Sequence, residues 1–253
     1  MKFDKQDKSA ELIFGIRPVI EAIKAGKEVD KILLQKDLHG PLFNELTLVA
    51  QQHKVPTTRV PVEKLNSYTR KNHQGVVAFI SAVIYASLDN IISQTYQSGK
   101  TPSLLILDRI TDVRNFGAIA RTAECLGVNA LIIPSRGSAQ VNSDAVKTSA
   151  GALNYIPICR EDNLKNTIAY LKENGFKIIA CTEKTDKLIY DADFTGPSAI
   201  IMGSEENGIS PEYLKRSDEA VKIPMSGKIE SLNVSVATGM ILSEMVRQRI
   251  KIK

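Results

Sequence analysis

Four short, nearly continuous apolar runs occur beyond residue 103 of this 253-residue chain, and they limit its fold more than any other feature. They lie at 104–107, 130–133, 177–181 and 199–202. Apolar runs without alternation are typical of strands buried on both faces, as in a mostly parallel sheet. Because helical segments such as 163–172 lie between them, the pattern predicts an α/β domain.

The first third of the chain predicts a second, smaller α/β unit. Its pattern indicates helices at 16–25 and 42–51 and strands at 29–34 and 75–80. The segment that follows is rich in Ser, Asn and Gln and shows no strong buried pattern, so we expect a linker there. The predicted organisation is a domain over 1–81, a linker over 82–101 and a domain over 102–253.

Composition excludes several classes of protein. No run of about 18 apolar residues occurs, so we expect no membrane span. The polar segment 1–8 lacks the apolar core of a signal peptide, so we expect a cytoplasmic protein. The three cysteines are widely spaced and odd in number, which argues against a disulfide framework. The three histidines lie at no metal-ligand spacing, so we expect no metal.

Positive charge is concentrated in the N-terminal third. Residues 1–80 carry 13 Lys and Arg against 9 Asp and Glu, whereas residues 81–253 carry 20 against 19. Contacts with phosphates supply most non-specific affinity for nucleic acid, so this excess fits an RNA-contacting module. A solvated basic surface would give the same count.

The C-terminal domain has no glycine-rich phosphate loop of the GxGxxG or GxxxxGK[ST] type, which argues against a dehydrogenase or a nucleotide hydrolase. Its polar segments lie instead at 107–127, 200–211 and 221–235. We expect Asn115 to cap a helix that ends at Gly127, and Ser231 to cap the last helix, 231–249. Each segment alone is also compatible with an ordinary turn or a solvated helix face.

Together, the three segments resemble the SpoU (TrmH-type) family of the SPOUT class of RNA 2′-O-ribose methyltransferases. The similarity lies in NFGAIARTAECLG at 115–127, MGSEENGIS at 202–210 and IPMSGKIESLNVSVATGMILSE at 223–244. GIRPVIEAI at 15–23 and HQGVVA at 73–78 are similar to the small L30e-like domain of the 23S ribosomal RNA guanosine 2′-O-methyltransferase subgroup.

The resemblance implies a fold and a set of partners. The C-terminal α/β domain, with its mostly parallel sheet, would form a deep trefoil knot over about 200–249, which general rules of chain topology would exclude. An L30e-like α/β domain that holds RNA would precede it. S-adenosylmethionine is the implied cofactor, ribosomal RNA the implied substrate, and a homodimer with the last helix at its interface the implied assembly.

The resemblance also implies site residues. The implied catalytic residues are Asn115, Arg121, Glu205, Ser231 and Asn233. The implied cofactor contacts are Thr182, Gly203, Ile223 and Leu232, mainly through backbone groups. For RNA binding we expect Arg17, Lys71, His73 and Arg114. An ordinary arginine is no base, because its pKa lies above about 12. We therefore expect Arg121 to bind a phosphate and stabilise the developing alkoxide, or to relay the proton while phosphate-bound.

Three alternatives to a ribosomal RNA methyltransferase remain open. The chain could methylate transfer RNA, or protect the ribosome of its own cell against an antibiotic by methylation. It could also be a non-catalytic RNA-binding or ribosome-assembly protein that retains the fold.

Overall fold

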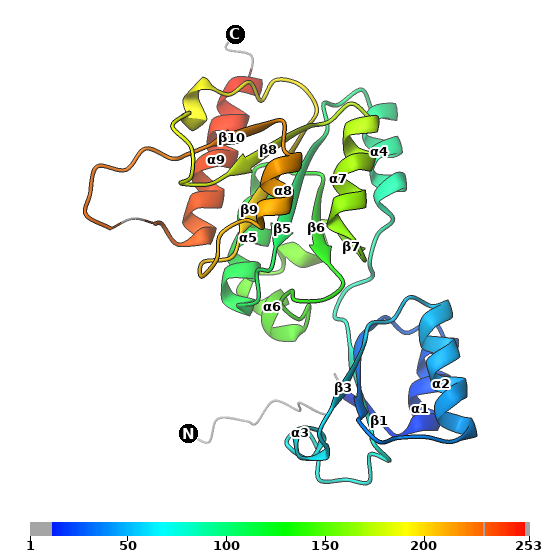
Figure 1. Ribbon diagram of the computed structural model, residues 1–253. Helices are drawn as coiled ribbons and strands as arrows, with labels where there is room; N and C mark the ends of the chain where they lie inside the picture. The colour runs from blue at the N-terminus through cyan, green and yellow to red at the C-terminus, as the bar shows by residue number, and fades with distance from the viewer. Residues whose placement is uncertain (1–11, 230, 251–253) are drawn as a thin grey trace, which may run out of the picture. The chain divides into compact units, whose positions relative to one another are not determined.

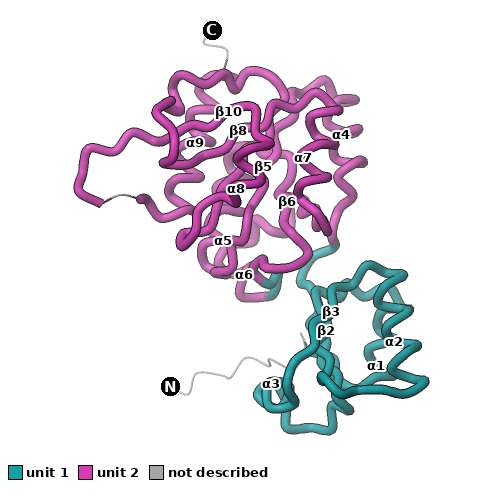
Figure 2. Tube along the Cα trace, viewed as in Figure 1, with its two compact units in different colours: residues 1–84, 140–142 teal, residues 85–139, 143–253 magenta. Residues whose placement is uncertain are grey.

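The chain builds two separate sheets, one in each of two units (Figures 1 and 2). The structure, a computed structural model, describes residues 12–229 and 231–250. The units comprise residues 1–84 with 140–142 and residues 85–139 with 143–253. Residues 1–11 and 251–253, at the ends of the two predicted domains, lie outside the described residues, as does Glu230 of the third motif.

The N-terminal sheet has the strand order β1-β4-β2-β3, in which only β2 and β3 are parallel. Its strands are β1 (Leu12–Phe14), β2 (Val29–Gln35), β3 (Thr57–Val60) and β4 (Val76–Ile80). Helices α1 (Ile16–Lys24) and α2 (Pro41–Gln52) cover one face, and the short α3 (Val62–Asn66) lies on the other side (Figure 1). The helices and strands predicted here are therefore confirmed to within a few residues.

The larger sheet has six strands in the order β10-β8-β9-β5-β6-β7, and every neighbouring pair is parallel. Its strands are β5 (Ser103–Asp108), β6 (Ala130–Pro134), β7 (Ile158–Glu161), β8 (Lys177–Cys181), β9 (Ser198–Gly203) and β10 (Glu219–Val221). The four predicted apolar runs form β5, β6, β8 and β9. The predicted mostly parallel sheet is thus confirmed.

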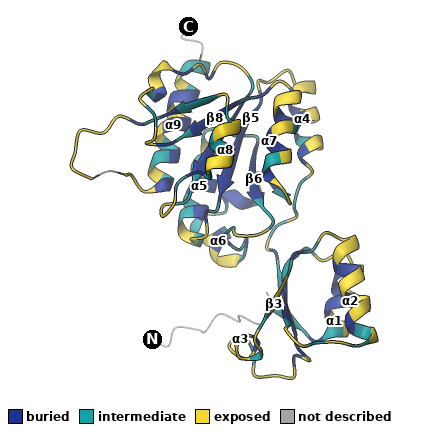
Figure 3. Ribbon diagram, viewed as in Figure 1, coloured by how far each residue is buried: buried dark blue, intermediate teal, exposed yellow. Residues whose placement is uncertain are grey.

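Helices cover both faces of this sheet, so its central strands are buried (Figures 1 and 3). The helices are α4 (Leu88–Gln97), α5 (Val113–Cys125), α6 (Ser143–Thr148), α7 (Leu164–Glu173), α8 (Pro211–Arg216) and α9 (Val234–Arg249), with 3-10 turns at Ala152–Asn154 and Ile189–Asp191. Helix α9 follows β10 in the chain and packs against α5. Along residues 12–229 and 231–250, no helix combines the length and apolar composition of a membrane span.

The segment 82–101 differs from the predicted linker, because most of it belongs to the second unit. It contains α4, and Leu88 and Ile92 of this helix are buried in the core with strands β5 and β6. The apolar stripe is narrow, and the polar residues that suggested a linker occupy the rest of the helix.

In a parallel sheet the carboxyl ends of all strands lie at one edge, and ligands bind where the strand order reverses. Here the chain runs outward from β5 through β6 and β7, and then crosses to β8 on the other side of β9. The loops after β5, β8 and β9 therefore meet at the place where a ligand site is expected.

Candidate active site

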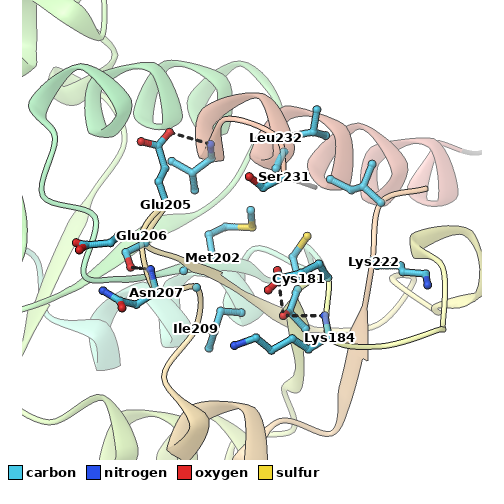
Figure 4. Close-up of a pocket in the computed structure, with 18 of the residues that line it drawn as sticks. Cys181, Lys184, Met202, Glu205, Glu206, Asn207, Ile209, Lys222, Ser231 and Leu232 are labelled. Carbon is cyan, nitrogen blue, oxygen red and sulfur yellow. Dashed lines mark hydrogen bonds between the residues drawn. The ribbon is translucent and has the colours of Figure 1, made fainter. Parts of the chain in front are cut away.

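A cavity of about 700 Å³ lies at the carboxyl ends of β8 and β9 (Figure 4). The loop 203–209 supplies much of its remaining wall, together with Lys222, Ile223, Met225, Ser231 and Leu232. All four predicted cofactor contacts line it: Thr182, Gly203, Ile223 and Leu232. Ser231 and Glu205, from the predicted catalytic set, line it as well. The volume lies in the range of about 300–1,000 Å³ that is typical of small-molecule sites.

The backbone comes unusually close to itself at Gly203, where β9 ends. A Cβ atom there would lie 2.2 Å from both Gly208 C and Ile209 N. The loop is closed by Gly208 N, which donates to Ser204 O over 2.8 Å, and by Asn207 N, which donates to Ser204 Oγ over 3.2 Å. Only glycine at position 203 permits this packing, which shapes one wall of the pocket.

The pocket combines an apolar floor with charged groups at its opening. Met202, Ile209 and Ile223 are buried beneath it, whereas Glu205 and Glu206 are exposed. In Figure 4, Ser231 and Leu232 lie on one side of the pocket, and Ile209 and Lys184 lie on the other. A flat apolar ring and a cationic sulfonium fit this arrangement, since carboxylates stabilise positive charge nearby.

Burial keeps two thiols of this unit protonated. Desolvation, with a smaller contribution from Glu183, raises the pKa of Cys181 in the pocket wall to about 12. Desolvation, with Glu161, raises the pKa of Cys159 to about 12. Since the thiolate is the nucleophile, both thiols are expected to resist alkylation at neutral pH.

We expect iodoacetamide at pH 8 to label the exposed Cys125 well before Cys159 or Cys181. Peptide mass spectrometry along a time course measures the order. Labelling of Cys181 as fast as of Cys125 would show that the pocket wall is open to solvent.

Three of the predicted catalytic residues meet beside the pocket, although they are far apart in the chain. Asn233 Nδ2 donates to Asn115 Oδ1 over 3.0 Å and to Glu205 Oε1 over 2.6 Å. The backbone N–H of Val234 also lies 3.4 Å from Glu205 Oε1 (Figure 4). These bonds join the loop after β9 to the first turns of α5 and α9, so the cluster of Asn115, Glu205 and Asn233 fixes one edge of the pocket.

The helix caps differ from the prediction at both helices. Asp112, not Asn115, caps α5, because Asp112 Oδ1 accepts from the backbone N–H groups of Arg114 and Asn115. Asn233, not Ser231, caps α9, through bonds from Ser235 N and Val236 N to its Oδ1. Asn115 is thereby free to place its side chain against Asn233.

The substitution Asn233→Ser distinguishes the helix-capping role of Asn233 from its bonds to Asn115 and Glu205. Serine caps a helix about as well as asparagine, so we expect the free energy of unfolding to change by less than about 0.5 kcal/mol. Loss of Nδ2 removes the bonds to Asn115 and Glu205, and we expect the methyl transfer that the family resemblance implies to slow about tenfold or more. Urea unfolding and single-turnover kinetics measure the two effects.

Asn233→Ala is the matched variant, since it removes the cap as well and is expected to lose about 1 kcal/mol of stability. Equal transfer rates in the Ser variant and the unmodified protein would show that the cluster does not support catalysis.

Arg121 lies on the exposed side of α5, two turns beyond Asn115, and no bond joins it to that cluster. Among the residues that the structure describes, the side chain of Arg121 has no hydrogen-bond or ion-pair partner. Arg114 is also exposed on this helix. A guanidinium without a protein partner is available to bind a phosphate of the substrate.

The sequence analysis missed an ion pair that supports the pocket loop. Asp108, the last residue of β5, is 2% exposed and accepts from Ser210 N over 2.6 Å. Arg109 donates to both Asp108 oxygens and, over 3.1 Å, to Gly208 O. The hydrogen bond to Asp108 raises the pKa of Arg109 above its ordinary value. A carboxylate directly after a fully apolar strand was the available signal.

Asp108→Asn is expected to lower the free energy of unfolding by about 1–2 kcal/mol and to weaken cofactor binding several-fold. The reason is that Arg109 loses its carboxylate, and the loop at Gly208 and Ser210 is held less firmly. Chemical unfolding and calorimetric titration measure these effects. Asp162→Asn, at an exposed position of the same unit, is the control and should change neither quantity. Identical behaviour of both variants would contradict this role of Asp108.

The RNA contacts predicted in the N-terminal unit differ in their surroundings. Arg17 and Lys71 are exposed. His73 is only 8% exposed, its Nε2 lies 2.9 Å from Asn66 Oδ1, and its Nδ1 accepts from Gly75 N. Both ring nitrogens are thus used inside the unit. We correct the prediction for His73, which fixes the turn before β4 and is not free to bind RNA.

Metal ligands are not gathered anywhere in the described parts of the chain. Over 12–229 and 231–250, no group of three or more His, Cys, Asp or Glu side chains could hold a metal ion.

Two family models match the chain. The one described as the SpoU rRNA Methylase family matches residues 102–243, and the one described as RNA 2′-O ribose methyltransferase substrate binding matches residues 12–86. A protein of Staphylococcus saprophyticus, described as a TrmH family tRNA/rRNA methyltransferase, is 36% identical over 238 residues, which cover 94% of this chain and 96% of the relative.

Solved structures are similar to this chain over all or part of its length. The SpoU methyltransferase AviRb from Streptomyces viridochromogenes, solved with S-adenosylmethionine, is 25% identical with a TM-score of 0.59, and covers 98% of this chain and 94% of its own. The TrmH/SpoU tRNA modifying enzyme of A. aeolicus is 30% identical with a TM-score of 0.54, and covers 64% of this chain and 84% of its own. The predicted SPOUT fold class and the predicted cofactor are confirmed.

Proposed function

The chain belongs to the SpoU family of RNA methyltransferases, and we propose that it methylates the ribose 2′-hydroxyl of a guanosine in large-subunit ribosomal RNA. The observation that carries the proposal is the Asn115–Glu205–Asn233 cluster at the edge of a pocket lined by Thr182 and Gly203. The N-terminal unit supports ribosomal RNA as the substrate, since the tRNA enzyme of A. aeolicus covers only 64% of this chain.

The enzyme uses S-adenosylmethionine, which supplies a methyl group activated by its sulfonium. The residues that would hold it are Thr182, Gly203, Ile223 and Leu232, all in the pocket wall. Glu205 and Ser231 line the same pocket, so they would lie near the reacting groups of a bound cofactor. The chain's main task is alignment, because holding a hydroxyl in line with an activated methyl removes most of the entropic barrier.

The hydroxyl proton must leave as the new bond forms, and in the assignment favoured here it passes to solvent water. We assign Arg121 to the phosphate next to the reacting ribose, where its charge stabilises the developing alkoxide. Its exposed position on α5 and its lack of a described protein partner support this role. The alternative is a proton relay through the phosphate-bound guanidinium. An ordinary arginine could not take the proton, because its guanidinium is already protonated at neutral pH.

RNA also contacts residues outside the pocket. Arg17 and Lys71 of the N-terminal unit, and Arg114 of α5, are exposed cations that fit phosphates. Replacing any one of them with alanine is expected to lower the slope of log affinity for RNA against log salt concentration by about 1, the value for one phosphate contact.

The working assembly is a homodimer that uses α9. Val236 and Met240 on this helix are 52% and 37% exposed, and Tyr190 beside them is 54% exposed. Apolar side chains of this size are covered by partners in obligate interfaces. Sedimentation equilibrium is expected to give twice the chain mass of 27.8 kDa, and the single-chain mass would contradict the dimer.

A ribose-methylation map of ribosomal and transfer RNA, made with and without the gene, tests the substrate. We expect one site to be lost from large-subunit RNA and to be restored by the unmodified gene but not by Arg121→Ala. Loss of a site from transfer RNA would support ribose methylation but contradict ribosomal RNA as the substrate. No lost site anywhere would favour a binding or assembly role, and a strain that only loses antibiotic resistance together with its site would point to self-protection.

A further inference from the structure

The face of the N-terminal sheet that α1 and α2 leave uncovered is only partly closed by α3 (Figure 1). Side chains alternate along the strands, so Ile32 and Ala78 pack under the helices, whereas Leu33 and Val77 point to the other face. There they meet Leu65 of α3, which is fully buried. The rest of this face consists of half-buried apolar side chains, which leaves it accessible.

Three aromatic rings lie on this face, and each has a lysine over it. Tyr68 and Phe79 meet edge to face, with ring centroids 5.0 Å apart and planes at 84°. The Nζ atoms lie 5.0 Å from the Phe79 centroid for Lys31, 5.4 Å from Tyr68 for Lys64 and 5.9 Å from Phe14 for Lys71. We call these three rings and three lysines the aromatic face.

The chain that borders the aromatic face is strongly basic. Residues 60–73, which include α3 and the turn before β4, carry three basic residues and one acidic residue. Lysine is depleted at protein–protein interfaces, whereas lysines beside aromatic rings are typical of surfaces that bind single-stranded nucleic acid. The charge and the rings therefore favour RNA over a protein partner.

We propose that the aromatic face binds unpaired bases of the RNA substrate. Bases stack on the rings of Phe14, Tyr68 and Phe79, while the lysines turn from the rings to the phosphates. A sheet with exposed aromatic rings is an established way to hold splayed-out bases, and an intact duplex offers no free base faces to it. The inference rests on the proposed function, in that the substrate is RNA.

Anisotropy measurements on the full-length protein test the aromatic face. The probes are fluorescein-labelled oligouridine and an RNA duplex of equal length at one fixed salt concentration. Leucine keeps the apolar packing but cannot stack, so Tyr68→Leu and Phe79→Leu are each expected to weaken binding of the single strand about tenfold. Binding of the duplex and the salt dependence should stay unchanged, because the phosphate contacts remain.

Phe43→Leu is the matched control. Phe43 also has a cation over its ring, since Arg59 lies 5.0 Å from the centroid, but it is buried on the side of the sheet covered by α1 and α2. The substitution Phe43→Leu should therefore leave the affinity for oligouridine unchanged. Thermal unfolding shows whether Tyr68→Leu, Phe79→Leu and Phe43→Leu each fold. RNA affinities are compared only among the variants that fold.

The proposal for the aromatic face would be overturned if folded Tyr68→Leu and Phe79→Leu both kept their affinity for oligouridine. It would also be overturned if Phe43→Leu lost as much affinity as they do. A changed sedimentation coefficient without a change in RNA affinity would assign the face to a second copy and also overturn it. Methylation by the unmodified protein separates the two proposals. If it binds oligouridine through these rings yet methylates no RNA, the proposed function fails while the aromatic face stands.

Discussion

Gly203→Ala is expected to lose most binding of S-adenosylmethionine at concentrations that just saturate the unmodified protein. The new Cβ atom would lie 2.2 Å from Gly208 C and Ile209 N, which are backbone atoms and cannot turn aside as a side chain can. The loop 203–210 must move, and with it a wall of the pocket. We expect the affinity to fall about 100-fold or more, which corresponds to about 3 kcal/mol. Calorimetric titration measures it.

Gly196→Ala is the matched control, because a Cβ at this position meets nothing within 4 Å. Gly196 belongs to the same unit, and only its carbonyl oxygen has a role, as an acceptor from Arg249. Its affinity for the cofactor should equal that of the unmodified protein. Near-normal cofactor affinity in Gly203→Ala would show that the cofactor does not use this pocket.

Arg121→Lys is expected to lower kcat about 100-fold or more and to leave cofactor affinity unchanged. Lysine keeps the positive charge but loses the planar fork that holds a phosphate through two hydrogen bonds. Removal of one group that stabilises a developing oxyanion commonly costs a factor of this size. Arg121 is exposed and does not line the pocket, so the loss should appear in transfer and not in cofactor binding.

Single-turnover methyl transfer, with calorimetry for cofactor binding, separates the two effects. Arg216→Lys on α8 is the control, because this arginine is exposed and pairs at 3.5 Å with Glu212 in its own helix. Transfer at the unmodified rate in Arg121→Lys would remove Arg121 from the mechanism. A loss of cofactor affinity as large as the loss of rate would give it a structural role instead.

The buried strands of the larger sheet could be predicted because their burial on both faces leaves an unbroken apolar run. Helix α4 could not, since its buried stripe is short and Ser, Asn and Gln fill its other positions. Strands β7 and β10 are short and carry charged residues, so neither shows such a run. Tertiary packing, more than the local sequence pattern, determines the secondary structure of α4, β7 and β10.

The site was predictable only in part. Composition and periodicity marked the polar segments but gave no reason for Asn115, Glu205 and Asn233 to meet, because three distant parts of the chain must fold together first. The resemblance to a family supplied that grouping. Neither route found the pair of Asp108 and Arg109, whose importance depends on Gly208 and Ser210, about 100 residues away.

Nucleoside mass spectrometry tests the central claim most directly. Large-subunit ribosomal RNA from cells without the gene is incubated with the purified protein and S-adenosylmethionine that carries a deuterated methyl group. The account predicts that the label appears in one nucleoside, 2′-O-methylguanosine, and that Arg121→Lys reduces it at least tenfold. Label on a base instead of a ribose, or no label in this RNA, would contradict it.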